Sequence, residues 1–419
     1  MPRKPLNVIS SLATICLLAA ACSSPSASGG ASGTTKPALG SPIKVGQILP
    51  MTGANIALPE VGRSMTASIE ALNSAGGING HPLTLIQCDS MGDPNTEVQC
   101  AQSMVRDHVV ATLADNTFAS EDQVQKIFDV AGIPRIGIYK GAVSEYQSPV
   151  DFDFTGGGIF ILVAMMDNLV HKGHKKLTVV LPDAPQDAQS HLLLDPLAHS
   201  LGAEVVNYVL VSSASGDYSQ YVAQAQQHGA QGVVLGLPTA QLVQVAQAVN
   251  QLNPKIDFTT GIAGFTLNQL KQLGQFAKNA SYVSWTPGID DVNNFPGLAQ
   301  PIAALTTYVK GASVNTIIPQ ELQSWLAVHA FAEVMKAQTG TATAASVLAA
   351  FRMAKNVPMN GLIRPWTPTD YQSAGGLRSI VKNVSNPWAY RVAYTGTGTR
   401  TNASQLFNTF DGLSGTSLG

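Results

Sequence analysis

Short apolar runs and longer segments of helical period follow one another from residue 43 to residue 140. The runs are four to eight residues long, the length of buried strands, and the segments between them carry apolar residues at three- and four-residue spacing. Strands are predicted at 45–49, 82–87, 109–113 and 133–138, with helices at 61–74, 96–107 and from about 120. This alternation predicts a parallel sheet with helices on both faces.

The pattern restarts near residue 177. The segment LTVVLPDAPQD, 177–187, has the same order of apolar strand, Leu-Pro and polar loop as VGQILPMTGAN, 45–55. Helices are then predicted at 191–202, 218–229 and 240–252, and strands at 204–211, 232–237 and 257–262. We therefore expect two similar α/β lobes.

The later chain is too irregular for a third lobe. It contains a predicted strand at 280–285, helices at 319–337 and 344–353, and a strand within NPWAYRVAYTG. These elements must return to the first two lobes.

The N-terminus is predicted to be an export signal. Arg3 and Lys4 precede the apolar run LNVISSLATICLLAAA and Cys22, which is too short for a comfortable membrane span. LLAAAC resembles a bacterial lipobox in which Cys22 would carry lipid; the alternative is an ordinary signal cut after Ala19 and Ala21. Residues 1–22 would be the signal and 23–42, rich in Ser, Gly and Pro, a flexible tether spanning roughly 25 Å. We expect an exported protein anchored to the outer face of the cytoplasmic membrane.

The cysteines fit that location. Of the four, Cys16 lies in the signal and Cys22 would be acylated, which leaves Cys88 and Cys100. In an exported protein such a pair predicts a disulfide, and a metal site would need further ligands nearby. Two buried free thiols are the alternative.

Composition and motifs exclude several functions. Charged residues make up 12% of the 419 residues and the net charge is −2, so no basic face is expected for nucleic acid. GxSxG, GxxxxGK[ST] and HExxH are absent, and His171 and His174 in HKGHKK fit a solvated helix end. We expect neither metal nor cofactor and no enzymatic activity. An extracellular enzyme stays a weaker hypothesis, because catalytic groups can meet only in the folded chain.

Three stretches together resemble one family. IKVGQILPMTG, EALNSAGGINGHPLTLIQCDSMGDPNTEVQCAQ and AGIPRIGI are similar to the leucine/isoleucine/valine-binding proteins, the substrate-binding components of bacterial ABC importers. Weaker similarity continues through HKKLTVVLPD, LGAEVV and GAQGVVLGL to about residue 300.

The resemblance implies the type I periplasmic binding protein fold, with two doubly wound parallel-sheet lobes and a hinge of three crossings. The crossings would lie near 153–158, 284–289 and 360–368. The N-terminal lobe would be 43–155 plus 288–362, and the C-terminal lobe 157–285 plus 365–419. Ligand would bind in the cleft by hinge closure. The Cys88–Cys100 bridge would close the loop SMGDPNTEV.

Ligand residues in the first lobe are predicted on loops at the carboxyl ends of strands. Ser120 lies where the family places a serine that binds the ligand carboxylate, although it could only cap the next helix in a box with Gln123. Asn116 and Thr117 are alternatives. Ser144 could supply a hydroxyl that Val143 lacks, and Tyr139 could line the cleft or pack in the core.

The second lobe departs from the family pattern. Amino-acid binders carry an acid for the ligand ammonium, but the loop TGIAGFTL has none, so Asp187 or Asp183 would take that role or the ligand lacks an ammonium. Phe265 could stack on an apolar ligand.

The predicted function is a monomeric solute receptor that delivers a branched-chain amino acid or related small molecule to an ABC permease. The alternatives are a ligand-sensing lobe, or a binder of an ammonium-free carboxylate, amide or aromatic compound.

Overall fold

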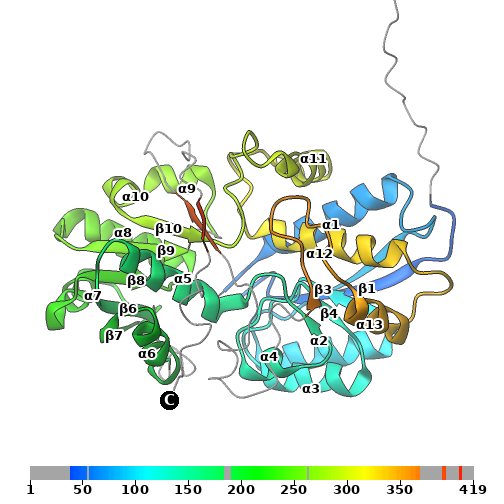
Figure 1. The fold of residues 1–419 in the computed structure, drawn as a ribbon, viewed down its shortest axis with the longest axis horizontal. Coiled ribbons are helices and arrows are strands. Elements are labelled where there is room, and N and C mark those ends of the chain that lie inside the picture. Colours follow the sequence, from blue (N-terminus) through cyan, green and yellow to red (C-terminus); the bar gives the residue numbers. More distant parts are fainter. Residues whose placement is uncertain are drawn as a thin grey trace, which may run out of the picture. The chain divides into compact units, whose positions relative to one another are not determined.

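A computed structural model describes residues 38–53, 56–183, 190–261, 264–368, 389–392 and 405–407. Their strands form two sheets, and helices flank each sheet (Figure 1). The predicted signal, most of the tether and Cys22 lie outside the described residues. Within them, no helix is both long and apolar enough to cross a membrane.

The first sheet has five parallel strands in the order β2-β1-β3-β4-β5. Its strands are β1 (Ile43–Leu49), β2 (Leu83–Asp89), β3 (Ala111–Leu113), β4 (Arg135–Ile136) and β5 (Asp151–Phe152). The connecting helices are α1 (Pro59–Ser74), α2 (Pro94–Arg106), α3 (Glu121–Ala131) and α4 (Val143–Gln147). The order, with β1 in the interior, is what a doubly wound sheet requires.

The second sheet has seven strands in the order β12-β11-β10-β9-β8-β6-β7. Its parallel strands are β6 (Lys176–Pro182), β7 (Glu204–Val211), β8 (Gly232–Leu235), β9 (Asp257–Gly261) and β10 (Ser281–Ser284). Two antiparallel strands, β11 (Ala389–Val392) and β12 (Gln405–Phe407), extend it. Its helices are α5 (Gly157–His171), α6 (His191–Ser200), α7 (Ser219–Ala225), α8 (Thr239–Leu252), α9 (Leu267–Gln272) and α10 (Gln275–Asn279).

The chain between β10 and β11 returns to the first sheet. It forms α11 (Ala299–Tyr308), α12 (Glu321–Lys336) and α13 (Ala344–Met353). Helix α12 packs on α1, where Ser64 Oγ donates to the Glu321 carbonyl at 2.7 Å and Ser324 Oγ to the Val61 carbonyl at 2.8 Å. Helix α12 is buried on nearly all sides, its polar Glu321, Gln323 and Ser324 included, so it belongs to the core.

The double glycine after α1 ends that helix. Gly76 and Gly77 have positive φ angles of 102° and 68°, and a Cβ at Gly77 would lie 2.2 Å from the His81 carbonyl. Asn73 then accepts from Leu83 N at 2.8 Å and donates to Leu83 O at 2.9 Å. The turn is thus tied to the start of β2.

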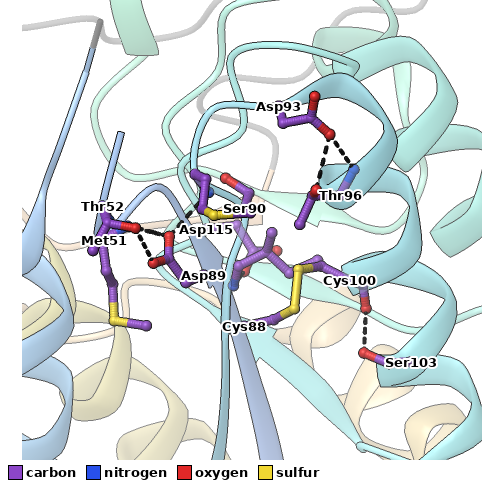
Figure 2. The surroundings of a disulfide bond; sticks show 12 residues. Met51, Thr52, Cys88, Asp89, Ser90, Asp93, Thr96, Cys100, Ser103 and Asp115 are labelled. Atoms are coloured by element: carbon purple, nitrogen blue, oxygen red, sulfur yellow. Dashed lines mark hydrogen bonds between the residues drawn. A yellow bond between two sulfur atoms is a disulfide. The ribbon is translucent and has the colours of Figure 1, made fainter. Parts of the chain in front are cut away.

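The predicted disulfide is confirmed. Cys88 near the end of β2 is bonded to Cys100 on α2, with a Cα–Cα distance of 5.7 Å (Figure 2). Asp93 caps α2 by accepting from Thr96 N at 2.8 Å. Asp89 accepts from Met51 N at 2.9 Å and from Thr52 Oγ1 at 2.6 Å, which joins the ends of β1 and β2 (Figure 2). In the chain-entropy model, closing the loop with the Cys88–Cys100 bond contributes about 2–3 kcal/mol to the free energy of unfolding.

Some predicted boundaries are wrong. Strand β4 has two residues where 133–138 was predicted, because Gly137 turns the chain with φ 68°. The helix predicted at 218–229 is α7 followed by a separate 3-10 turn, Gln227–Gly229, since His228 has φ 59°. The segment predicted as the first crossing, 153–158, runs into a helix, because Gly157 begins α5.

Candidate functional site

The loops after β1, β3 and β4 meet at one edge of the first sheet, because parallel strands present their carboxyl ends together. Backbone hydrogen bonds link these loops: Asn116 N donates to the Ile48 carbonyl at 2.9 Å, and Tyr139 N to the Asp115 carbonyl at 3.0 Å. We call this edge, residues 114–121 and 137–145, the first-lobe edge.

Arg135 is fully buried beneath the first-lobe edge and holds its loops. Its Nε donates to Asp115 Oδ2 at 3.2 Å, its Nη1 to Gln125 Oε1 at 2.6 Å and to Glu145 Oε1 at 3.3 Å. Its Nη2 donates to Thr117 Oγ1 at 3.1 Å. Burial acts to lower the pKa of Arg135, but the surrounding carboxylates outweigh it and raise the pKa.

Two of the carboxylates around Arg135 also accept hydrogen bonds from the backbone. Asp115 Oδ1 accepts from Ile48 N at 2.9 Å. Glu145 Oε2 accepts from Gly141 N at 2.7 Å and Ala142 N at 3.1 Å. The two loops of the edge and the end of β1 are therefore tied to one buried guanidinium through these two carboxylates.

A second buried cation, Lys140, lies toward the crossing into the second lobe. Its Nζ is 5.2 Å from the centroid of the Tyr146 ring, and Tyr146 Oη donates to the Gly156 carbonyl at 2.6 Å. Burial raises the pKa of Asp151 to about 7 and also raises that of Asp153, although Lys140 acts to lower both. The polar network thus continues from the edge to residues 153–156.

Glu97 of α2 reaches the same edge from behind. Its fully buried carboxylate accepts from three consecutive backbone N–H groups, those of Phe118 at 3.0 Å, Ala119 at 3.0 Å and Ser120 at 2.7 Å. Burial raises the pKa of Glu97, while these three hydrogen bonds and Arg135 oppose the rise.

Three predicted ligand residues, Asn116, Thr117 and Ser120, lie on the first-lobe edge and are buried. Asn116 Nδ2 donates to the Ala114 carbonyl at 3.0 Å, and among the described residues its Oδ1 has no hydrogen-bond partner. Thr117 Oγ1 donates to Glu145 Oε1 at 3.3 Å.

Ser120 is the residue just before α3, but its side chain makes no capping hydrogen bond. Gln123 N donates to the Ser120 carbonyl at 3.1 Å instead, because the Ser120 backbone, at φ −149° and ψ 41°, does not have cap geometry. The alternative that Ser120 only caps the helix in a box with Gln123 is therefore wrong. That the Ser120 hydroxyl contacts the ligand stays a prediction.

Tyr139 is partly exposed on the same edge. Its ring lies 6.0 Å from that of Phe118, and a Cβ at Gly158 of α5 would be 3.2 Å from its hydroxyl. Burial and then Asp153 raise the pKa of Tyr139 to about 12. The Ser144 hydroxyl donates to Asp122 Oδ1 at 2.6 Å. Their roles as ligand contacts stay predictions.

The second-lobe candidates differ in exposure. Phe265 is 2% exposed and belongs to the main hydrophobic cluster, so a ligand could stack on it only if the surrounding side chains moved. Asp183 is exposed, and Asp187 lies outside the described residues.

Sequence reasoning missed Glu97, Arg135, Lys140 and Glu145. A signal existed for Arg135, because a charge inside the apolar run IPRIGI is unusual in a buried strand. Glu97 gave none, since a glutamate in the first turn of a helix after Asp-Pro is ordinary.

A family model described as "Periplasmic binding protein" matches residues 42–376. The chain belongs to the periplasmic binding protein family. The match covers the first sheet and the parallel strands of the second, and it confirms the family predicted from the sequence. An amino acid binding protein from Pseudomonas aeruginosa is 27% identical over 201 residues, which are 46% of this periplasmic binding protein and 53% of the relative. The match thus spans about half the length of that curated relative.

Solved structures share the fold. A possible leucine/isoleucine/valine-binding protein from Rhodopirellula baltica SH 1 has a TM-score of 0.69 at 15% identity, covering 90% of this periplasmic binding protein and 100% of that chain. An extracellular ligand-binding receptor from Verminephrobacter eiseniae has a TM-score of 0.67 at 18% identity, covering 85% and 99%. The two α/β lobes are thus those of type I periplasmic binding proteins.

Proposed function

We propose that this periplasmic binding protein is the exported receptor of an ABC importer, which captures an amino acid or related small molecule between its lobes. Family membership across residues 42–376 is the observation that carries the proposal. The buried, hydrogen-bonded loops of the first-lobe edge support it, because a receptor needs its contacts held before ligand arrives. Delivery to a permease and a lipid anchor at Cys22 belong to the same proposal.

The crossings would act as the hinge. Trp366 Nε1 donates to the Asp153 carbonyl at 2.7 Å, and the Trp366 ring packs edge-on against Phe154 at 5.2 Å. Trp366 lies in the segment predicted as the third crossing and Asp153 in the first. Tied together in this way, the two crossing segments would bend as a unit while each lobe stays rigid. The lobe boundaries predicted from the sequence are part of this proposal.

Thermal unfolding against a panel of amino acids, small acids, amides and aromatic compounds tests binding. A ligand at about 100 times its dissociation constant stabilises the folded state by about 2.7 kcal/mol, which raises the melting temperature measurably. Small-angle scattering with the same compound should show a smaller radius of gyration.

Two results would contradict the proposal. One is a panel in which no compound changes either the melting temperature or the radius of gyration. The other is chemical conversion of a bound compound, which would indicate an enzyme. A radiolabelled ligand taken up only by cells that contain both the receptor and its permease would establish import.

A further inference from the structure

The backbone N–H groups of residues 118–120 converge on one carboxylate. Three consecutive N–H donors around a single acceptor form the kind of concave anion site that proteins use for carboxylates and phosphates. Here the acceptor belongs to the protein: Glu97 takes all three hydrogen bonds, at 3.0, 3.0 and 2.7 Å, and is fully buried. This loop is also where the sequence predicts contact between Ser120 and a ligand carboxylate.

A ligand carboxylate at Ser120 would therefore find these donors occupied. It would also lie next to further negative charge. Glu121 follows Ser120 directly, is half-buried and forms no ion pair among the described residues. Burial raises the pKa of Glu121 to about 7, and the neighbouring carboxylates of Glu145, Glu97 and Asp122 add to the rise. Repulsion between neighbouring carboxylates disfavours a further negative charge at this position.

The nearby cations do not neutralise the negative charge around Ser120. Arg135 lies within 3.2–3.8 Å of Asp115, Glu145 and Asp151, three carboxylates for one positive charge. Lys140 is fully buried over the Tyr146 ring, near Asp151 and Asp153. The first-lobe edge therefore carries more buried acids than cations.

We propose that Glu97 is a specificity-determining residue: its carboxylate fills the anion position of loop 118–120 from inside the protein, so the edge selects a solute that presents a neutral or cationic group to Ser120. An amide, an amine or a hydroxyl fits this description, and a carboxylate does not. The inference rests on the proposed function, because it assumes that ligand reaches Ser120. It also favours, among the ligand classes left open by the sequence, those without a carboxylate at this end.

The first experiment isolates the anion position and needs no knowledge of the ligand. Glu97→Ala removes the carboxylate and leaves three donors around a small cavity, which acetate can refill. We expect acetate at neutral pH to raise the melting temperature of Glu97→Ala saturably, by several degrees, and to leave the wild type unchanged. Glu97→Gln should not respond, because its amide fills the space. Glu70→Ala, which removes an exposed glutamate of α1, is the charge-matched control.

Amide NMR of the wild type covers the case in which Glu97→Ala does not fold. The backbone signals of residues 118–120 should stay in place as acetate is added to the wild-type protein. Acetate that moves these signals saturably in the wild type would overturn the inference. So would an equal thermal response of the wild type and Glu97→Ala.

The second experiment tests the solute class with matched pairs, leucine and leucinamide, and benzoate and benzamide. In any pair that binds the wild type, we expect the amide to bind at least about tenfold more tightly than the acid, with a smaller ratio in Glu97→Ala. An acid that binds tightly and moves the signals of 118–120 would overturn the inference. If no solute binds at all, the proposed function fails, and the selection of ligand fails with it. The acetate result would still show whether Glu97 fills the anion position.

Discussion

The first-lobe edge and the interior of the seven-stranded sheet bury different kinds of polar side chain. Beneath the first-lobe edge the buried groups are ions, with Arg135 at their centre. Around the second sheet, hydroxyls and amides are buried: Thr178 Oγ1 of β6 donates to the Ala225 carbonyl at 2.8 Å, and Asn168 Nδ2 of α5 to Thr259 Oγ1 of β9 at 3.0 Å. The strands that lead into the first-lobe edge are also short.

Strands β3, β4 and β5 have three, two and two residues, whereas β6 and β7 have seven and eight. Short strands form few ladder hydrogen bonds, so the loops that follow them need other partners. The carboxylates around Arg135 supply those partners. The comparison indicates that side-chain charge holds these loops of the first lobe, whereas neutral hydroxyls and amides make the buried side-chain hydrogen bonds cited for the second lobe.

Replacing Arg135, the cation at the centre of the first-lobe network, should cause the largest loss of stability. Arg135→Met leaves Asp115, Glu145 and Asp151 buried without their cation, and we expect a loss of about 3–5 kcal/mol in the free energy of unfolding. Thr259→Val, the matched change in the second sheet, should cost only about 1 kcal/mol. Chemical denaturation of both variants measures the difference, and equal losses would contradict the comparison.

The disulfide should have the next largest effect, confined to the first lobe. Opening the Cys88–Cys100 bond removes about 2–3 kcal/mol in the chain-entropy model. Reductant should lower the melting temperature of the wild type and not that of a Cys88→Ala/Cys100→Ala variant. Hydrogen exchange should quicken in β2 and α2 first; simultaneous loss of protection in β6 and β8 would show that the two lobes are coupled.

The fold could be predicted from the sequence where local chemistry decides it. The glycines at 76 and 77 end α1, the Asp-Pro at 93–94 begins α2, and the apolar period sets α12 and α13 close to their predicted bounds. Strand β4 was predicted too long because nothing local shows that Gly137 turns the chain under the Phe154 ring.

The site was harder to predict because its groups meet only in the folded chain. Glu97 and the N–H groups of 118–120 are more than twenty residues apart in sequence, and no periodicity connects them. Arg135 and Glu145 are ten residues apart on different elements. A loop's composition indicates which side chains could contact ligand, but it does not reveal which backbone donors are already occupied.

A smaller effect should come from Glu121 and depend on pH. The pKa of Glu121 is raised to about 7 in the folded protein, above its usual 4.5. Between these values the folded state keeps a proton that the unfolded chain has released, so this group's contribution to stability falls as pH rises from about 4.5 to 7. Glu121→Gln should be more stable than the wild type at pH 8, by less than about 1 kcal/mol because the group is half-exposed, and equal to it near pH 4.

Melting temperatures measured from pH 4 to pH 8 test this expectation. Asp151 contributes a slope of the same sign and remains in the variant, so the slope should decrease without vanishing. An unchanged slope in Glu121→Gln would show that solvent reaches the carboxylate in the folded protein.

Asp257 of the second lobe should show the opposite sign and the smallest effect. Burial acts to raise its pKa, but His174, with Nε2 at 2.8 Å, and Lys172, with Nζ at 3.6 Å, outweigh it and lower the pKa below its usual value. Its contribution to stability is therefore present above about pH 4 and is lost as pH falls through the lowered value. Asp257→Asn should cost a few tenths of a kcal/mol at pH 7 and less at high salt, since the side chain is 43% exposed. If Asp257→Asn and Glu121→Gln changed stability in the same direction at pH 7, the contrast between an acid-crowded first lobe and a paired acid in the second would not hold.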